Sequence, residues 1–320
     1  MRALVNRGPG DFRIEEVPDP RPGPDELLVR PLFTGVCITD KHVYEGRGFG
    51  HRDSWSEGLV MGHEFAGVVH EMPADMDGWM VGDRVAVDPR IYCNQCLNCR
   101  GGFVTQCERG ARWLGVGDGR DGGYAELCAV PAYACYRLPD AVTDELGSVV
   151  EPAACATRSV RLSGFASGDN VVILGAEDYG LLILQQLSQT AGEVVVVDPS
   201  QVRREAALRL GATHVVDPAA GSAAGAIRQV FPRGADLVFV SMEDYVPAAN
   251  DYLRLGFSVA RVQGTVGIVR AYGDAPYARI QPHVPMLKEV TVRHFGAFFG
   301  IEPIRGGRAR GDWQLAVDGM

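Results

Sequence analysis

The chain has 320 residues, with 31 basic and 40 acidic side chains and a formal net charge of −9. Its hydrophobic content of 46% and charged content of 22% are typical of a globular protein and argue against a disordered chain or a coiled coil. The acidic balance argues against a nucleic-acid partner, and no apolar run approaches the roughly 18 residues that span a membrane. Because the amino terminus lacks the apolar core of a signal peptide, we expect a cytoplasmic protein with a small-molecule substrate.

The first 150 residues have the pattern of a β-rich domain. Short alternating segments separated by Gly, Pro and Asp turns are typical of antiparallel strands. Such segments lie at residues 2–7, 26–33, 64–72, 83–90 and 125–139. Because few stretches have helical periodicity, the pattern predicts an antiparallel, barrel-like domain at residues 1–150.

The remainder alternates between apolar strands and helical patterns. The strand-like segments lie at residues 171–176, 193–198, 213–217, 235–241, 264–273 and 289–296. The helical patterns between them lie at residues 181–191, 202–212, 223–231 and 246–256. This alternation predicts the α/β class, with a doubly wound parallel sheet in a domain at 151–295 and a terminal segment at 296–320.

Four of the eight cysteines lie within fifteen residues: Cys93, Cys96, Cys99 and Cys107. We interpret them as a structural zinc site in a lobe at residues 90–110, because four thiolates complete a tetrahedron around Zn²⁺ and leave no position for substrate. An iron–sulfur cluster is the alternative, but the bacterial ferredoxin run ends in x3-C-P, whereas the last gap here is seven residues. Four unrelated buried cysteines are a further alternative.

A second set of possible metal ligands is more widely spaced. Cys37 lies upstream, Gly62 precedes His63 and Glu64, and Glu151 opens the next segment. One thiolate, one imidazole and one or two carboxylates could hold a zinc ion with an exchangeable position, as catalytic zinc sites do. Each residue alone is weak evidence, because a lone histidine is more often a core or surface residue.

The strand at 171–174 leads into the sequence GAEDYG at residues 175–180, where a dinucleotide-binding fold has G-x-G-x-x-G. Gly175 and Gly180 fill the first and third glycine positions, but Glu177 replaces the second. At that position the backbone approaches the pyrophosphate. Like charges about 4 Å apart repel by roughly 1 to 4 kcal/mol, so we expect Glu177, together with Asp178, to weaken dinucleotide binding.

Asp198 ends the next strand, eighteen residues beyond Gly180. An acid at this place can bind the adenosine ribose hydroxyls and repel a 2′-phosphate, which favours NAD over NADP. The alternative is that Asp198 caps a helix before Pro199 and Ser200.

Taken together, these motifs resemble the zinc-dependent medium-chain dehydrogenase/reductase family, which contains alcohol, polyol and threonine dehydrogenases. The resemblance rests on C-x-T-D-x-H from residue 37, G-H-E at 62–64, the four-cysteine lobe, GDGRDGGYAEL at 117–127 and Glu-Pro at 151–152. These motifs occur in the family's order along nearly the whole chain. The resemblance implies a GroES-like catalytic domain and a Rossmann nucleotide domain, with two zinc ions and NAD as cofactors.

The resemblance also implies roles for single residues. Cys37, His63 and Glu151 correspond to the ligands of the catalytic zinc, with Glu64 as an alternate ligand. Cys155, one helical turn after Glu151, is the other ligand to consider.

Further roles follow from the same correspondence. Asp40 would orient His63. Thr39 and His42 match the family's proton relay, and Arg203 matches an arginine near the adenine. The alternative for Thr39 and His42 is a hydrogen-bonded turn at the end of a strand.

Two functions agree with these features. The first is an NAD-linked zinc oxidoreductase that oxidises a secondary hydroxyl of a polyol, sugar, aminocyclitol or hydroxy amino acid, or runs the reverse reduction. The second is a redox-neutral zinc enzyme, such as a lyase or isomerase, or a non-catalytic partner. Glu177 and a C-terminus shortened relative to the family favour the second.

Two expectations concern the surface of the protein. The shortened terminus would expose apolar surface unless a rearranged segment or a neighbouring subunit covers it, so we expect a homo-oligomer. The polar segment at residues 45–58, with His51, Arg52 and Trp55, is a candidate wall of the substrate pocket.

Overall fold

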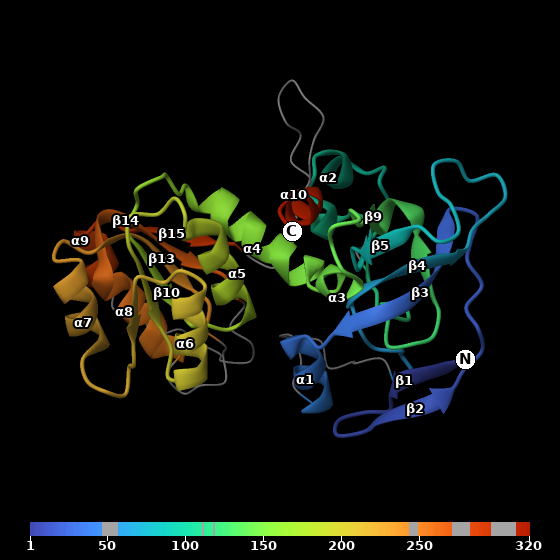
Figure 1. Ribbon diagram of the computed structural model, residues 1–320, viewed down its shortest axis with the longest axis horizontal. Helices are drawn as coiled ribbons and strands as arrows, with labels where there is room; N and C mark the ends of the chain where they lie inside the picture. Colours follow the sequence, from blue (N-terminus) through green and yellow to red (C-terminus); the bar gives the residue numbers. More distant parts are fainter. Residues whose placement is uncertain (47–56, 111, 118, 243–248, 271–281, 296–311) are drawn as a thin grey trace. The chain divides into compact units, whose positions relative to one another are not determined.

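A computed structural model of the protein describes residues 1–46, 57–110, 112–117, 119–242, 249–270, 282–295 and 312–320 (Figure 1). The chain divides into two compact units. The first contains Met1–Ala154 and Phe299–Met320, and the second contains Cys155–Phe298. Within the described ranges, no helix is long and apolar enough to cross a membrane.

The first unit is built on a five-stranded antiparallel sheet in the order β8-β3-β4-β5-β9. Its strands are β3 (Glu26–Gly35), β4 (Glu64–Glu71), β5 (Arg84–Val87), β8 (Cys128–Pro131) and β9 (Cys135–Arg137). The expected strand at 125–139 is therefore two strands, because the chain makes a 3₁₀ turn at Ala132–Ala134 after Pro131. This three-residue turn joins opposite edges of the sheet, so the sheet curls as predicted for a GroES-like domain.

Smaller elements surround this sheet. The expected strand at 2–7 is β1 (Arg2–Asn6), and it pairs with a strand that the sequence pattern did not reveal, β2 (Phe12–Glu16). The four-cysteine lobe lies between the paired strands β6 (Arg90–Ile91) and β7 (Arg112–Trp113). The lobe and the sheet connections contain α1 (Ile38–Tyr44), α2 (Leu97–Arg100), a 3₁₀ turn (Val104–Gln106) and α3 (Asp144–Gly147).

The second unit is built on a six-stranded parallel sheet in the order β12-β11-β10-β13-β14-β15. The strands are β10 (Val171–Leu174), β11 (Val194–Val197), β12 (His214–Val216), β13 (Ala235–Val240), β14 (Ala260–Ile268) and β15 (Thr291–His294). The strand order reverses between β10 and β13. In open α/β sheets, ligands bind at the carboxyl ends of the strands at such a reversal.

Four helices follow strands of this sheet as the alternation predicts, and a fifth, α9, was not predicted. They are α5 (Asp178–Leu187), α6 (Gln201–Arg209), α7 (Ala223–Val230), α8 (Ala249–Val259) and α9 (His283–Leu287). Helix α5 packs on α6, and α7 packs on α8. A further helix, α4 (Val150–Ser163), carries the chain from the first unit into the second.

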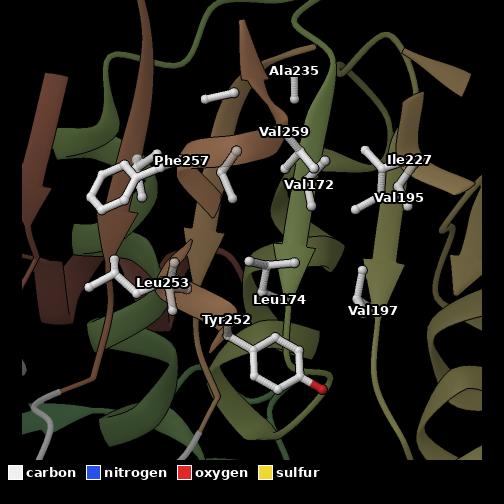
Figure 2. Close-up of a cluster of buried hydrophobic side chains, with 14 of the residues drawn as sticks. Val172, Leu174, Val195, Val197, Ile227, Ala235, Tyr252, Leu253, Phe257 and Val259 are labelled. Atoms are coloured by element: carbon white, nitrogen blue, oxygen red, sulfur yellow. The ribbon is translucent and has the colours of Figure 1, made fainter. Parts of the chain in front are cut away.

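The core of the second unit follows from strand alternation. Val172 and Leu174 of β10 face one side of the sheet and pack with side chains from α7 and α8 (Figure 2). Figure 2 shows the ring of Tyr252, from α8, beside Leu174 at the end of β10. Val171 and Ile173, which alternate with these residues, are also completely buried. Both faces of the sheet are therefore covered, and its strands are apolar throughout.

The terminal helix α10 (Asp312–Asp318) packs on the first unit. The ring of its Trp313 is buried and stacks on Tyr136 of β9, with ring centroids 5.5 Å apart. The end of the chain thus covers part of the first unit itself, which was one of the two expected ways to bury its apolar surface. The expected homo-oligomer stays a prediction.

Trp313→Ala should lower the free energy of unfolding of the first unit by about 3–5 kcal/mol, because it leaves a cavity against Tyr136. Urea titration followed by circular dichroism measures this loss. Met320→Ala, in the same terminal segment but exposed, should change stability by less than about 0.5 kcal/mol. Equal effects of the two substitutions would show that α10 does not contribute to the core.

Candidate active site

The pairing of β3 with β4 brings the first metal-ligand candidates together. In the antiparallel register, Gly35 at the end of β3 lies opposite Glu64 at the start of β4. Cys37 follows β3 as the residue before α1, and His63 directly precedes β4. Because both chain segments meet at the same end of the strand pair, the Cys37 and His63 side chains can meet.

Cys37, His63 and Glu64 are all buried, and each offers a ligand atom within 4.8 Å of the others. The turn before His63 depends on Gly62, which has a φ of +94°. A Cβ on Gly62 would lie 2.7 Å from the ring of Tyr124, so only glycine fits. A buried thiol, imidazole and carboxylate so close together are stabilised by a shared cation, and the donor set is one that zinc accepts.

The pKa of Cys37 is affected by the carboxylates near it. Burial, together with the nearby carboxylates of Glu64 and Glu151, raises the pKa of Cys37 well above its usual value. The thiol is therefore neutral until a cation binds, and metal binding would release its proton. Glu151 lies in the first turn of α4 and is buried, but the group within 4.8 Å contains Glu64 instead.

Asp40 links the cluster to its surroundings. Its Oδ2 accepts hydrogen bonds from the backbone N–H of Cys37 at 3.0 Å and from the Tyr124 hydroxyl at 2.9 Å. Its Oδ1 lies 3.8 Å from Nδ1 of His63, which is beyond hydrogen-bond distance, so the expected orienting role of Asp40 stays a prediction. Tyr124 was not a predicted site residue, although the motif GDGRDGGYAEL contains it.

The predicted relay residues lie on α1, beside Cys37. Thr39 Oγ1 is 3.4 Å from Sγ of Cys37. His42 follows three residues later, so the two side chains share one face of the helix. Cys155 is buried on α4 and is not part of the three-residue group. The segment with the predicted pocket residues His51, Arg52 and Trp55 lies outside the described residues.

The four-cysteine lobe forms a second group. Its four sulfur atoms all lie within 4.8 Å of one another, and Sγ of Cys93 is 3.9 Å from Sγ of Cys99, far longer than a disulfide bond. Backbone N–H groups of Gln95 and Cys96 lower the pKa of Cys93 to about 6. Burial raises the pKa of Cys99 to about 12, so the fit to a closed zinc site rests on the grouping of the four sulfur atoms.

The predicted nucleotide residues meet at the carboxyl edge of the parallel sheet. Leu174 of β10 pairs with Val197 of β11, so Gly175 and Asp198 follow side by side. Gly175 has a φ of +103°, and a Cβ on Gly180 would lie 1.9 Å from the carbonyl oxygen of Gly175. Glycine is therefore required at both positions, for the turn and for the close approach of α5 to β10.

Both acids of the loop have arginine partners that the sequence analysis did not identify. Glu177 forms an ion pair with Arg203 of α6, at 2.8 Å from Oε1 to Nη1. Asp178 pairs with Arg270, just beyond β14, and this arginine also lies over the ring of Tyr179. The expected repulsion of a pyrophosphate is therefore partly offset within the protein.

Known proteins are similar to this chain in sequence. The family model of the alcohol dehydrogenase GroES-like domain matches residues 23–140, and that of zinc-binding dehydrogenases matches residues 180–314. The L-threonine 3-dehydrogenase of Shewanella sediminis is 34% identical over 237 residues, which cover 72% of this chain and 67% of that protein. The chain spans 62 to 67% of the length of four such threonine dehydrogenases.

Solved structures give a similar result. A zinc-binding dehydrogenase from Sinorhizobium meliloti, bound to NADP, is 30% identical with a TM-score of 0.84, covering 99% of this chain and 87% of that chain. The 2R,3R-butanediol dehydrogenase of Bacillus subtilis is 26% identical with a TM-score of 0.81, covering 99% and 87%. Both units of this chain therefore have the folds of zinc-binding dehydrogenases.

Zinc content should distinguish the two groups of ligands. The purified protein should hold two equivalents of zinc, one for each group, and Cys99→Ala or Cys37→Ala should each remove one. Only Cys99→Ala should markedly lower the melting temperature, because the four-cysteine site fixes the fold of its lobe. Elemental analysis and thermal melting measure both effects.

Cys135→Ala is the matched control, because Cys135 is buried but belongs to neither group. It should keep both equivalents of zinc. A wild-type protein with no zinc, or the same zinc loss in all three variants, would contradict the assignment.

Proposed function

Because the chain belongs to the zinc-dependent medium-chain dehydrogenase family, we propose that it is an NAD-linked oxidoreductase that oxidises a secondary hydroxyl by hydride transfer, or reduces the corresponding carbonyl. The observation that carries the proposal is the buried cluster of Cys37, His63 and Glu64, with Thr39 beside it. The names of two similar proteins, L-threonine 3-dehydrogenase and 2R,3R-butanediol dehydrogenase, support a hydroxy amino acid or polyol-type substrate.

The first unit supplies the site for the reacting hydroxyl. Cys37 and His63 would hold the catalytic zinc together with Glu151, with Glu64 as the alternate carboxylate. Zinc in such a site acts as a Lewis acid and lowers the pKa of an alcohol. Asp40 contributes by accepting hydrogen bonds from Cys37 N–H and Tyr124, which hold the backbone of Cys37 in place, and its other oxygen would orient His63.

The proton of the substrate hydroxyl then has to leave a buried place. The Thr39 hydroxyl can accept this proton while donating its own, because a hydroxyl is both donor and acceptor. His42, on the same face of α1, can pass a proton to solvent near neutral pH. We assign these two residues as the relay.

The second unit supplies the nucleotide site. Gly175 and Gly180 leave room for the loop and the start of α5, whose N-terminus favours a pyrophosphate. Asp198 follows β11 at this edge, and Nη1 of Arg203 lies 3.9 Å from its Oδ2. An acid at this place disfavours the 2′-phosphate of NADP. NAD bound there would accept the hydride; Asp198 supports NAD as the cofactor of this chain, whereas the Sinorhizobium protein binds NADP.

Cys37→Ala tests this proposal. The wild-type enzyme should reduce NAD with one member of a panel of polyols and hydroxy amino acids, and Cys37→Ala should lower kcat/KM by about 1000-fold or more, since the metal contributes several kcal/mol. Absorbance of NADH measures the rate, and zinc analysis should show the four-cysteine site still filled.

Cys135→Ala should retain wild-type turnover in the same assay. Undiminished activity of Cys37→Ala would contradict the mechanism. No binding of NAD or NADH tighter than about millimolar, with zinc present, would instead favour a redox-neutral zinc enzyme.

A further inference from the structure

Glu177 occupies the second glycine position of the nucleotide loop without backbone strain. It is the residue before α5, and its φ of −81° and ψ of −169° are extended values that any residue adopts. Its side chain is only 7% exposed. The question is therefore what the buried carboxylate does there, rather than how the backbone tolerates it.

The carboxylate of Glu177 shares one guanidinium with Asp198. Arg203 Nη1 lies 2.8 Å from Oε1 of Glu177 and 3.9 Å from Oδ2 of Asp198. Asp198 is completely buried, and its two oxygens already accept backbone N–H groups of Ala176 at 2.8 Å and Ser200 at 2.7 Å. Asp198 does not itself cap α6, because the cap residue is Ser200, whose hydroxyl accepts from the backbone N–H of Arg203.

This arrangement places Glu177 closer to solvent than Asp198. Asp198 has no exposed surface, whereas the side chain of Arg203 is 44% exposed and that of Glu177 is 7% exposed, so an adenosine ribose would meet the Glu177–Arg203 pair from the arginine side. Oε2 of Glu177 is buried and has no hydrogen-bond partner among the described residues. A buried acceptor without a donor is unfavourable, and a ribose hydroxyl is a donor of the right kind. A phosphate dianion carries no proton and cannot donate a hydrogen bond to this oxygen.

Other acids near Glu177 and Asp198 add negative charge at this edge of the sheet. Asp217, which follows β12, is paired with Arg204 at 3.0 Å. Burial, together with the charges of Asp198, Asp217 and Glu177, raises the pKa of Tyr252 to about 12. Three carboxylates thus face two arginines here, and a 2′-phosphate would add further negative charge.

We propose that Glu177 restricts the nucleotide site to NAD. In this inference, which rests on the proposed function, Glu177 accepts a hydrogen bond from the adenosine ribose and keeps Arg203 neutralised. Arg203 is placed to bind a 2′-phosphate, because its guanidinium already lies between the two acids at this edge. Removal of Glu177 frees this arginine.

Binding of NADH and NADPH to the zinc-loaded full chain tests the inference. Glu177→Gly restores the residue of the fingerprint and should improve the affinity for NADPH relative to NADH by tenfold or more. Glu177→Gln, which keeps the size and removes the charge, should shift the ratio in the same direction. Isothermal calorimetry measures each Kd without any need for a substrate.

Two further variants make the test specific. Arg203→Ala in the Glu177→Gly background should cancel the gain for NADPH, since the freed guanidinium is then absent. Asp178→Asn is the matched control: Asp178 is the other acid of the loop, but it pairs with Arg270. Asp178 lies in the first turn of α5, which would face the pyrophosphate that both dinucleotides share, so the ratio of the NADPH and NADH affinities should not change.

The outcomes separate the inference from the proposed function. A wild-type protein that binds NADH and NADPH equally, or an unchanged ratio in Glu177→Gly, would overturn the inference and leave hydride transfer intact. Binding of neither dinucleotide by the wild type or by any variant would overturn both.

Discussion

The pairing of β3 with β4 is the constraint on which the proposed chemistry depends. The antiparallel pairing, with Gly35 opposite Glu64, brings Cys37 and His63 to the same end of the strand pair. A slip of one residue would turn Glu64 to the other face of the sheet. Asp40 holds the backbone of Cys37 in place, because its carboxylate accepts a hydrogen bond from the Cys37 N–H. The same carboxylate lies beside the His63 ring. The ligands are thus positioned by backbone pairing before any metal binds.

In the second unit, the paired ends of parallel strands position the residues of the proposed nucleotide site. Pairing of β10 with β11 sets the glycine loop beside Asp198, and the buried faces of both strands hold this edge in place (Figure 2). The unusual acid at position 177 fits because Arg203 neutralises it. The negative charge of Glu177, which is unfavourable beside a pyrophosphate, is therefore balanced by Arg203 of the next helix. We propose that the same ion pair determines which dinucleotide binds.

The sequence predicted what depends on local spacing. The C-x2-C-x2-C-x7-C cluster, the βα alternation and the two required glycines could be identified because each is a short-range pattern. Features that depend on distant residues were missed. Tyr124 contacts Asp40 from 84 residues away, and Arg203 contacts Glu177 from 26 residues away. The turn at Ala132–Ala134 was also missed, because the strands on either side of it read as one apolar run.

The most direct test of the account is the fate of the carbinol hydrogen. A secondary alcohol that the enzyme converts would be deuterated at its carbinol carbon and incubated with NAD and the zinc-loaded protein, and the nicotinamide would be analysed by mass spectrometry. Hydride transfer predicts one deuterium in each NADH formed, in step with the carbonyl product. Conversion of the substrate with all deuterium retained in the product or lost to water, and with no NADH formed, would contradict the account and identify a redox-neutral enzyme.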